Sequence, residues 1–122
     1  MAEHNKTGKE GEQEAVAWLK KQGYRIIQTN WRWHHYELDI LATNEEELVV
    51  VEVKTRSENY LLPPEKAVNK GKIKRLVSAA DAYIRYHMLD IPVRFDVIIV
   101  IKKKNEYQIE HIQEAFYAPV NH

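Results

Sequence analysis

Residues 48–54 read Leu48-Val49-Val50-Val51-Glu52-Val53-Lys54, a run of mainly β-branched residues that predicts a strand. Successive side chains of a strand point to opposite faces, so Glu52 and Lys54 share one face. Two charges on an otherwise apolar strand are costly unless they are paired, hydrated or bound to a metal ion. Glu52 and Lys54 are therefore candidate functional residues, and the alternative is an exposed ion-pair ladder.

The preceding segment, residues 37–42, alternates in polarity and predicts a second strand that forms a hairpin with the first. Its alternation places Glu37 and Asp39 on one face, with Leu38 and Ile40 on the other. If the hairpin brings the two strands into register, three carboxylates and one ammonium group converge.

The remaining periodicity predicts two helices and three further strands. The helices are expected at 11–22, before Gly23, and at 65–87, after Pro63-Pro64; the strands are expected at 24–31, 94–101 and 107–112. Strand 94–101 is too apolar to have an exposed face and is predicted to be central, with Asp96 tied to Arg94 or to a backbone amide. The order α-β-β-β-α-β-β indicates the α/β class, with a mixed five-stranded sheet and helices packed against it.

Length and composition limit the classes of protein to which this chain can belong. A chain of 122 residues predicts a single domain, with loose ends at 1–8 and 116–122. A polar N-terminus and the lack of a membrane-length apolar run favour a cytoplasmic protein with no membrane partner. The absence of cysteine excludes disulfides, thiolate zinc sites and a cysteine nucleophile. A formal net charge of +0 gives no global argument for binding nucleic acid, although acidic and basic residues cluster locally.

Converging carboxylates beside an ammonium group suit the hydrolysis of phosphodiesters. Carboxylates hold a hard cation, which polarises the phosphate and lowers the pKa of a bound water. Lys54 would either orient and deprotonate that water or offset charge in the transition state. Glu12 shares a helix face with Val16 and Leu19, so it is either a ligand, a ligand-orienting group, or an acid favoured by the helix dipole.

The order of these residues resembles a known family. Asp39 followed by Glu52-Val53-Lys54 is similar to the core of the PD-(D/E)xK restriction-endonuclease-like superfamily. More narrowly, the chain resembles the bacterial YraN-like family of uncharacterised proteins, which is similar to archaeal Holliday-junction resolvases. The matching segments are Gly11-Glu12, Gly23-Tyr24, Asn30-Trp31-Arg32, Glu37-Leu38-Asp39-Ile40-Leu41, Val51-Glu52-Val53-Lys54-Thr55-Arg56, Lys72, Arg75-Leu76 and Arg94-Phe95-Asp96-Val97.

The resemblance implies a three-layer α/β/α fold with Mg²⁺ or Mn²⁺ at Asp39 and Glu52. It also implies that Lys54 is the catalytic lysine and Glu12 the acid contributed by the helix. One departure is Tyr36, which stands where the family usually has glycine. Tyr36 would either narrow the entrance to the site or offer a surface on which bases stack.

Three basic residues are predicted to bind substrate: Arg32, Arg56 and Lys72. Arg56 shares a strand face with Lys54, and the resemblance favours Lys72. Glu37 is either a supporting acid or a solvated strand-end residue. His34-His35 is predicted to be a turn, because adjacent side chains of an extended segment point apart and make a poor joint metal site.

Together these features predict a magnesium-dependent endonuclease. It would act on DNA rather than RNA, on branched or single-stranded forms, in repair or recombination, and it is the resemblance that implies branched DNA. The alternative is a non-catalytic module that keeps the fold and binds nucleic acid or protein. A homodimer would match the symmetry of a four-way junction, but the sequence identifies no dimer face.

Overall fold

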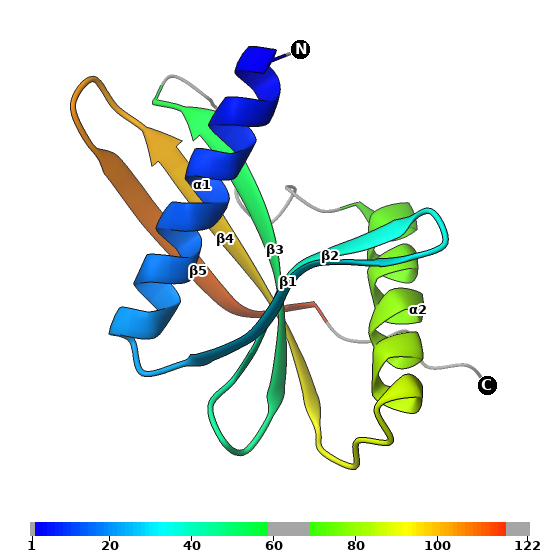
Figure 1. The fold of residues 1–122 in the computed structure, drawn as a ribbon. Helices are drawn as coiled ribbons and strands as arrows, with labels where there is room; N and C mark the ends of the chain where they lie inside the picture. The colour runs from blue at the N-terminus through cyan, green and yellow to red at the C-terminus, as the bar shows by residue number, and fades with distance from the viewer. Residues whose placement is uncertain (1, 59–68, 117–122) are drawn as a thin grey trace.

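A mixed five-stranded sheet carries one helix on each face in the computed structural model, which describes residues 2–58 and 69–116 (Figure 1). The elements are α1 (Ala2–Lys21), β1 (Arg25–Trp33), β2 (Tyr36–Thr43), β3 (Leu48–Ser57), α2 (Lys70–Tyr86), β4 (Val93–Lys102) and β5 (Tyr107–Phe116). The strands lie in sequence order, and only the β3–β4 pair is parallel. The predicted fold class and order of elements are confirmed.

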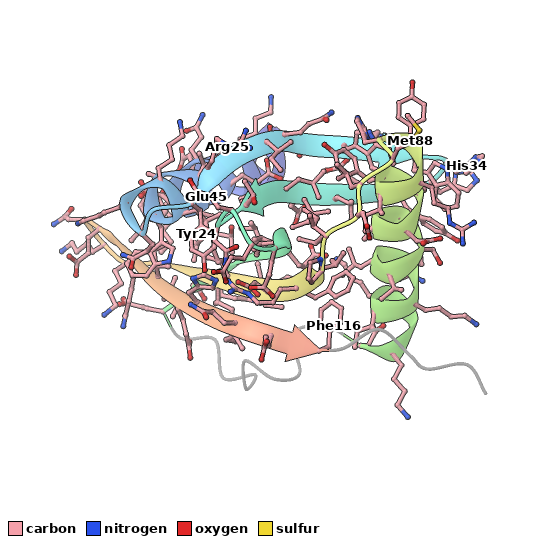
Figure 2. The ribbon with its side chains drawn as sticks, turned by 90° about the horizontal axis from the view of Figure 1, so that it is seen from below. Tyr24, Arg25, His34, Glu45, Met88 and Phe116 are labelled. Carbon is pink, nitrogen blue, oxygen red and sulfur yellow. The ribbon has the colours of Figure 1, made fainter. Side chains whose placement is uncertain are left out.

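Strand β3, which the β-branched run predicts, is buried on both faces. Val49 and Val51 pack toward α1, whereas Leu48 and Val50 pack toward α2. Figure 2 shows the side chains that fill the space between the sheet and α2, including Phe116. Strand β4 is interior, as expected, although β3 is the middle strand of the five.

The alternation predicted for the second strand is wrong at Asp39. Leu38 packs in the α2 cluster, whereas Ile40 packs in the α1 cluster, so these two side chains do not share a face. The reason is a bend: β2 pairs with β3 only from Thr43 to Ile40 and then departs from it (Figure 1). Where a strand bends away from its neighbour, alternate side chains no longer all point to the same face of the sheet.

Both helices begin at other residues than the periodicity predicts. Helix α1 begins at Ala2 rather than near Gly11, so the expected loose end at 1–8 is helical from Ala2. Helix α2 begins at Lys70, because the Asn69 side chain caps it by accepting a hydrogen bond from the Lys72 backbone N–H at 2.8 Å. Of the expected loose end at 116–122, Phe116 is the last residue of β5. Residues 117–122, like Pro63-Pro64 and residues 65–68, lie outside the described residues.

Neither helix, within the residues described, has the length and apolarity that crossing a bilayer would require.

Asp96 is fully buried and holds β4, β5 and α1 together. Arg94 donates two hydrogen bonds to its carboxylate, at 2.9 and 2.8 Å, and the Glu114 backbone N–H donates a third at 3.1 Å. His111 Nε2 lies 2.7 Å from the same carboxylate, and the Trp18 indole donates to His111 Nδ1 at 3.2 Å. The predicted ties to Arg94 and to a backbone amide are both present, whereas His111 was not foreseen.

The charge of Asp96 is stabilised by these neighbours. Burial alone would raise its pKa, but the hydrogen bonds from His111, Arg94 and Glu114 outweigh burial and hold the pKa of Asp96 below its ordinary value. Removing the carboxylate would leave Arg94 with Glu47, whose Oε1 lies 3.4 Å away, as its remaining acidic partner and would take away the two shorter hydrogen bonds to Asp96. Breaking a largely buried ion pair from one side in this way is costly.

We therefore expect Asp96→Ala to lower the free energy of unfolding by about 3–5 kcal/mol, measured by urea denaturation at pH 7. Asp81→Ala is the matched control, because Asp81 pairs with Arg85 on an exposed face of α2. That control should change stability by less than about 0.5 kcal/mol. Equal effects of the two substitutions would contradict a structural role for the Asp96 network.

Candidate functional site

The site lies where β2 and β3 separate. Their last paired residues are Ile40 and Val51. Two residues farther along β3, the Val53 backbone N–H donates to Asp39 Oδ2 at 2.8 Å. The Asp39 side chain therefore takes the place of the backbone acceptor that β2 would have supplied, and it does so at the base of the fork between the two strands.

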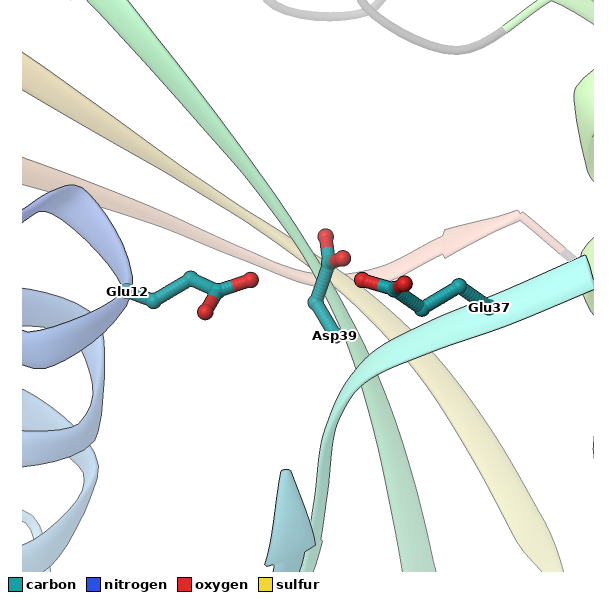
Figure 3. Close-up of side chains that lie close together, drawn as sticks. All are labelled: Glu12, Glu37 and Asp39. Atoms are coloured by element: carbon teal, nitrogen blue, oxygen red, sulfur yellow. The ribbon is translucent and has the colours of Figure 1, made fainter. Parts of the chain in front are cut away.

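Two further carboxylates meet Asp39 at this fork. Glu12 comes from α1 and Glu37 from β2, and one oxygen of each of the three side chains lies within 4.8 Å of the others (Figure 3). Burial, together with the neighbouring Asp39 and Glu37, raises the pKa of Glu12. Asn30 opposes this rise through a hydrogen bond to Glu12, and its backbone is left-handed, with φ of 53°. The structure thus groups Glu12 and Glu37, whose roles the sequence left open, with Asp39.

Glu52 adjoins this group and is 5% exposed. Its Oε1 lies 3.9 Å from Lys54 Nζ and 3.4 Å from Lys72 Nζ. Burial and the adjacent Asp39 carboxyl raise the pKa of Glu52 to about 8. Burial and the adjacent Lys72 lower the pKa of Lys54 to about 8. The predicted convergence of Asp39, Glu52 and Lys54 is present, and Lys72 joins it from α2.

A hollow of about 650 Å³, here called the fork hollow, opens beside these residues. It is lined by Glu12, Asn30, Glu37, Asp39 and residues 52–56, and also by Gly8. Its cationic side chains are those of Lys9, Arg32, Lys54, Arg56 and Lys72. All three residues predicted to bind substrate, Arg32, Arg56 and Lys72, therefore line it. Arg32 also pairs with Glu37 at 3.0 Å.

Gly11 explains how α1 comes close enough to deliver Glu12. Gly11 is buried in the middle of α1, and a Cβ atom built on it would lie 2.0 Å from Thr55 Oγ1 and 3.3 Å from Thr55 Cβ. A larger residue would require the Thr55 side chain to rotate or the helix to move away from β3. The sequence placed Gly11 at the start of the helix and missed this role, since the contact joins residues that are far apart in the chain.

The donor set fits a hard divalent cation. Glu12, Glu37 and Asp39 offer carboxylate oxygens, which are the ligands that Mg²⁺ and Mn²⁺ prefer, and Glu52 is placed beside them. The expected ligand pair, Asp39 and Glu52, thus lies within a larger set of acids. Lysine and arginine side chains around these acids could neutralise a phosphate held at the same place.

Comparisons with known proteins agree on one family. Residues 11–100 match the model described as Uncharacterised protein family UPF0102. A UPF0102 protein of Parabacteroides distasonis is 60% identical over 98% of both chains. Those of Bacteroides thetaiotaomicron and Flavobacterium psychrophilum are 56% and 47% identical, over 98% and 96% of this chain and 99% and 98% of the respective relatives. The resemblance to an uncharacterised bacterial family is confirmed, and these names assign no activity.

The close approach of Gly11 to Thr55 should contribute to the stability of the fold. Gly11→Ala should displace the Thr55 side chain or α1 and lower the free energy of unfolding by about 1–3 kcal/mol in urea denaturation. Gly8→Ala is the matched control, because a Cβ at Gly8 meets nothing within 4 Å. The control should stabilise the helix by up to about 1 kcal/mol. Two equally stable variants would show that α1 is not held by this close approach.

Glu52 should make the metal-free protein less stable as pH rises. Its pKa is about 8 in the folded state against 4.5 for an ordinary glutamate side chain, so the unfolded chain loses this proton first. Stability should therefore fall between about pH 5 and pH 8, by up to about 1.4 kcal/mol per pH unit. The lowered pKa of Lys54 adds little slope below about pH 7, since Lys54 is then largely protonated in both states. Closer to pH 8 the folded state begins to lose this proton first, which opposes part of the fall due to Glu52.

Glu52→Gln should remove this slope in urea denaturation at pH 5.5, 6.5 and 7.5 with a chelator present. The free energy of unfolding of Glu52→Gln should thus exceed that of the unmodified protein by an amount that grows with pH. Glu46→Gln, at an exposed residue, is the control and should keep the slope. Parallel pH profiles for the unmodified protein and Glu52→Gln would contradict the raised pKa.

Proposed function

This chain belongs to the Uncharacterised protein family UPF0102, and we propose that it is a magnesium- or manganese-dependent endonuclease that hydrolyses phosphodiester bonds in DNA. The family name gives no activity, so the proposal rests on the site. One observation carries it: Asp39, Glu52 and Lys54 meet at the fork between β2 and β3, where Glu12 and Glu37 add two further acids. Acids that hold a hard cation beside a buried lysine suit the hydrolysis of phosphodiesters.

Asp39 and Glu52 are the proposed metal ligands, with Glu12 and Glu37 as further ligands or as acceptors for bound water. A cation bound there would polarise the phosphate and lower the pKa of a coordinated water. Asp39 is held in place by its hydrogen bond from the Val53 backbone, so its carboxylate is positioned by the sheet itself. Glu52 is confined by burial and by the two neighbouring lysines.

Lys54 is the proposed catalytic lysine. Its pKa of about 8 leaves a share of the molecules with a neutral amine near neutral pH, and such an amine can take a proton from the attacking water. In its charged form the same group offsets the negative charge that develops on the phosphate. Lys72 stays beside Glu52 and supplies a second positive charge.

Arg32, Arg56 and Lys72 are proposed to hold the phosphates on either side of the bond that is cleaved, because all three line the fork hollow. We propose branched or single-stranded DNA as the substrate, with a role in repair or recombination. A two-fold homodimer would present two such sites to a four-way junction.

The proposal predicts cleavage that needs metal and Lys54. Labelled four-way junction, flap, single-stranded and duplex DNA would be incubated with the protein and increasing Mg²⁺ or Mn²⁺. At least one branched or single-stranded form should be cut only with metal, and Lys54→Ala should slow the cut by about 100-fold or more. Lys104→Ala, at an exposed lysine that does not line the fork hollow, should cut as the unmodified protein does.

Binding of DNA without cleavage under all metal conditions would overturn the proposal. It would favour a non-catalytic module that keeps the fold. Cleavage that survives Lys54→Ala would point to a contaminating nuclease or to a site elsewhere in the chain.

A further inference from the structure

A second hollow, of about 340 Å³, lies next to the fork hollow. The two hollows share four lining residues: Glu37, Asp39, Glu52 and Lys72. A ligand that occupies both must therefore pass the proposed metal ligands. The bond that is cleaved would lie at this junction, with one part of the substrate in each hollow.

The other walls of the second hollow differ in chemistry from those of the fork hollow. Tyr36, at the start of β2, is half-buried, and its ring lies 5.7 Å from that of Trp33. Leu76 of α2 is 4% exposed and adds an apolar surface. His35 and Arg75 are exposed and bring hydrogen-bonding groups to the same hollow. An aromatic face, an apolar side chain and polar groups together suit a flat heterocycle with polar edges.

We propose that this hollow binds one unpaired nucleobase, that of the nucleotide next to the phosphate held at the carboxylates. This inference rests on the proposed function and specifies its substrate. The hollow has room for about eleven water molecules at ~30 Å³ each, which is enough for a single base. The neutral base would lie beyond the acids, and the phosphate would lie beside Lys72.

The occupant has to be unpaired because a base in a duplex is stacked on both faces and bonded along its edge. It can enter a pocket only if it is extruded or already single-stranded. Tyr36 forms a wall of the second hollow and lies at the tip of the β1–β2 hairpin. It is next in the chain to the exposed His35. The substrate class is therefore DNA with an unpaired nucleotide at the cleaved bond, as in a single strand, a flap or a branch point.

A binding experiment tests the base pocket apart from cleavage. Single-stranded DNA with one 2-aminopurine would be titrated with protein in Ca²⁺ in place of Mg²⁺. Stacking on Tyr36 should quench the 2-aminopurine. Tyr36→Leu should abolish the quenching and weaken binding by roughly tenfold, whereas Tyr36→Phe should keep both. Tyr86→Leu is the matched control, since Tyr86 is 81% exposed and lines neither hollow, and it should bind as the unmodified protein does.

A change in the DNA also tests the base pocket, and this test does not depend on the folding of Tyr36→Leu. An abasic nucleotide placed next to the cleaved bond should lower the cleavage rate of the unmodified protein by roughly tenfold. Cleavage that needs Lys54 but is equal for abasic and complete DNA would overturn the base pocket and leave the proposed function intact. Absence of cleavage with quenching that depends on Tyr36 would overturn the proposed function and support the pocket. Equal binding by Tyr36→Leu and Tyr86→Leu would also overturn the pocket.

Discussion

The hydrogen bond from the Val53 backbone to the Asp39 carboxylate is the constraint around which the site is built. A strand that parts from its neighbour leaves backbone N–H groups without acceptors, and an unmet buried N–H is costly. Asp39 meets that need with its side chain, so β2 can bend away after Ile40 and open the fork hollow. One residue therefore ends the strand pairing and also places a carboxylate beside Glu52. Asp39 therefore has a structural role as a hydrogen-bond acceptor and a proposed role as a metal ligand.

The group of charges at the fork works against stability. Glu52 is almost fully buried beside Asp39, and Lys54 is partly buried beside Lys72, so each of these groups is pushed toward its neutral form. The rest of the chain offsets this cost. Both faces of β3 are packed with aliphatic side chains. The hydrogen bonds and ion pairs of Asp96 link β4 to β5. Clustered like charges that a fold tolerates are typical of functional sites, because they become favourable when a ligand of the opposite charge binds.

The sequence predicts those parts of the molecule that depend on local patterns. The alternation of side chains placed Glu52 and Lys54 on one face, and the β-branched run around them predicted a strand. Three features escaped because they depend on contacts between distant segments. The bend at Asp39 separates the side chains of Leu38 and Ile40, and Gly11 allows a close approach to Thr55. Tyr36 was expected at the entrance to the site, but not that α2 would form the same hollow with it. A repeating pattern carries no information about where two strands separate. A glycine in a sequence likewise does not show whether it ends a helix or lets it approach a strand.

The central claim is that the acids around Asp39 bind a divalent cation. The most direct test is a titration of Mn²⁺ into the protein, with free Mn²⁺ measured by electron paramagnetic resonance, for the unmodified chain and for Asp39→Asn. Asparagine can still accept the hydrogen bond from Val53, so the fold should persist while one negative charge is lost. The account predicts saturable binding that Mg²⁺ displaces and that Asp39→Asn weakens by roughly tenfold or more. Binding of equal strength in both proteins, or none in either, would contradict it.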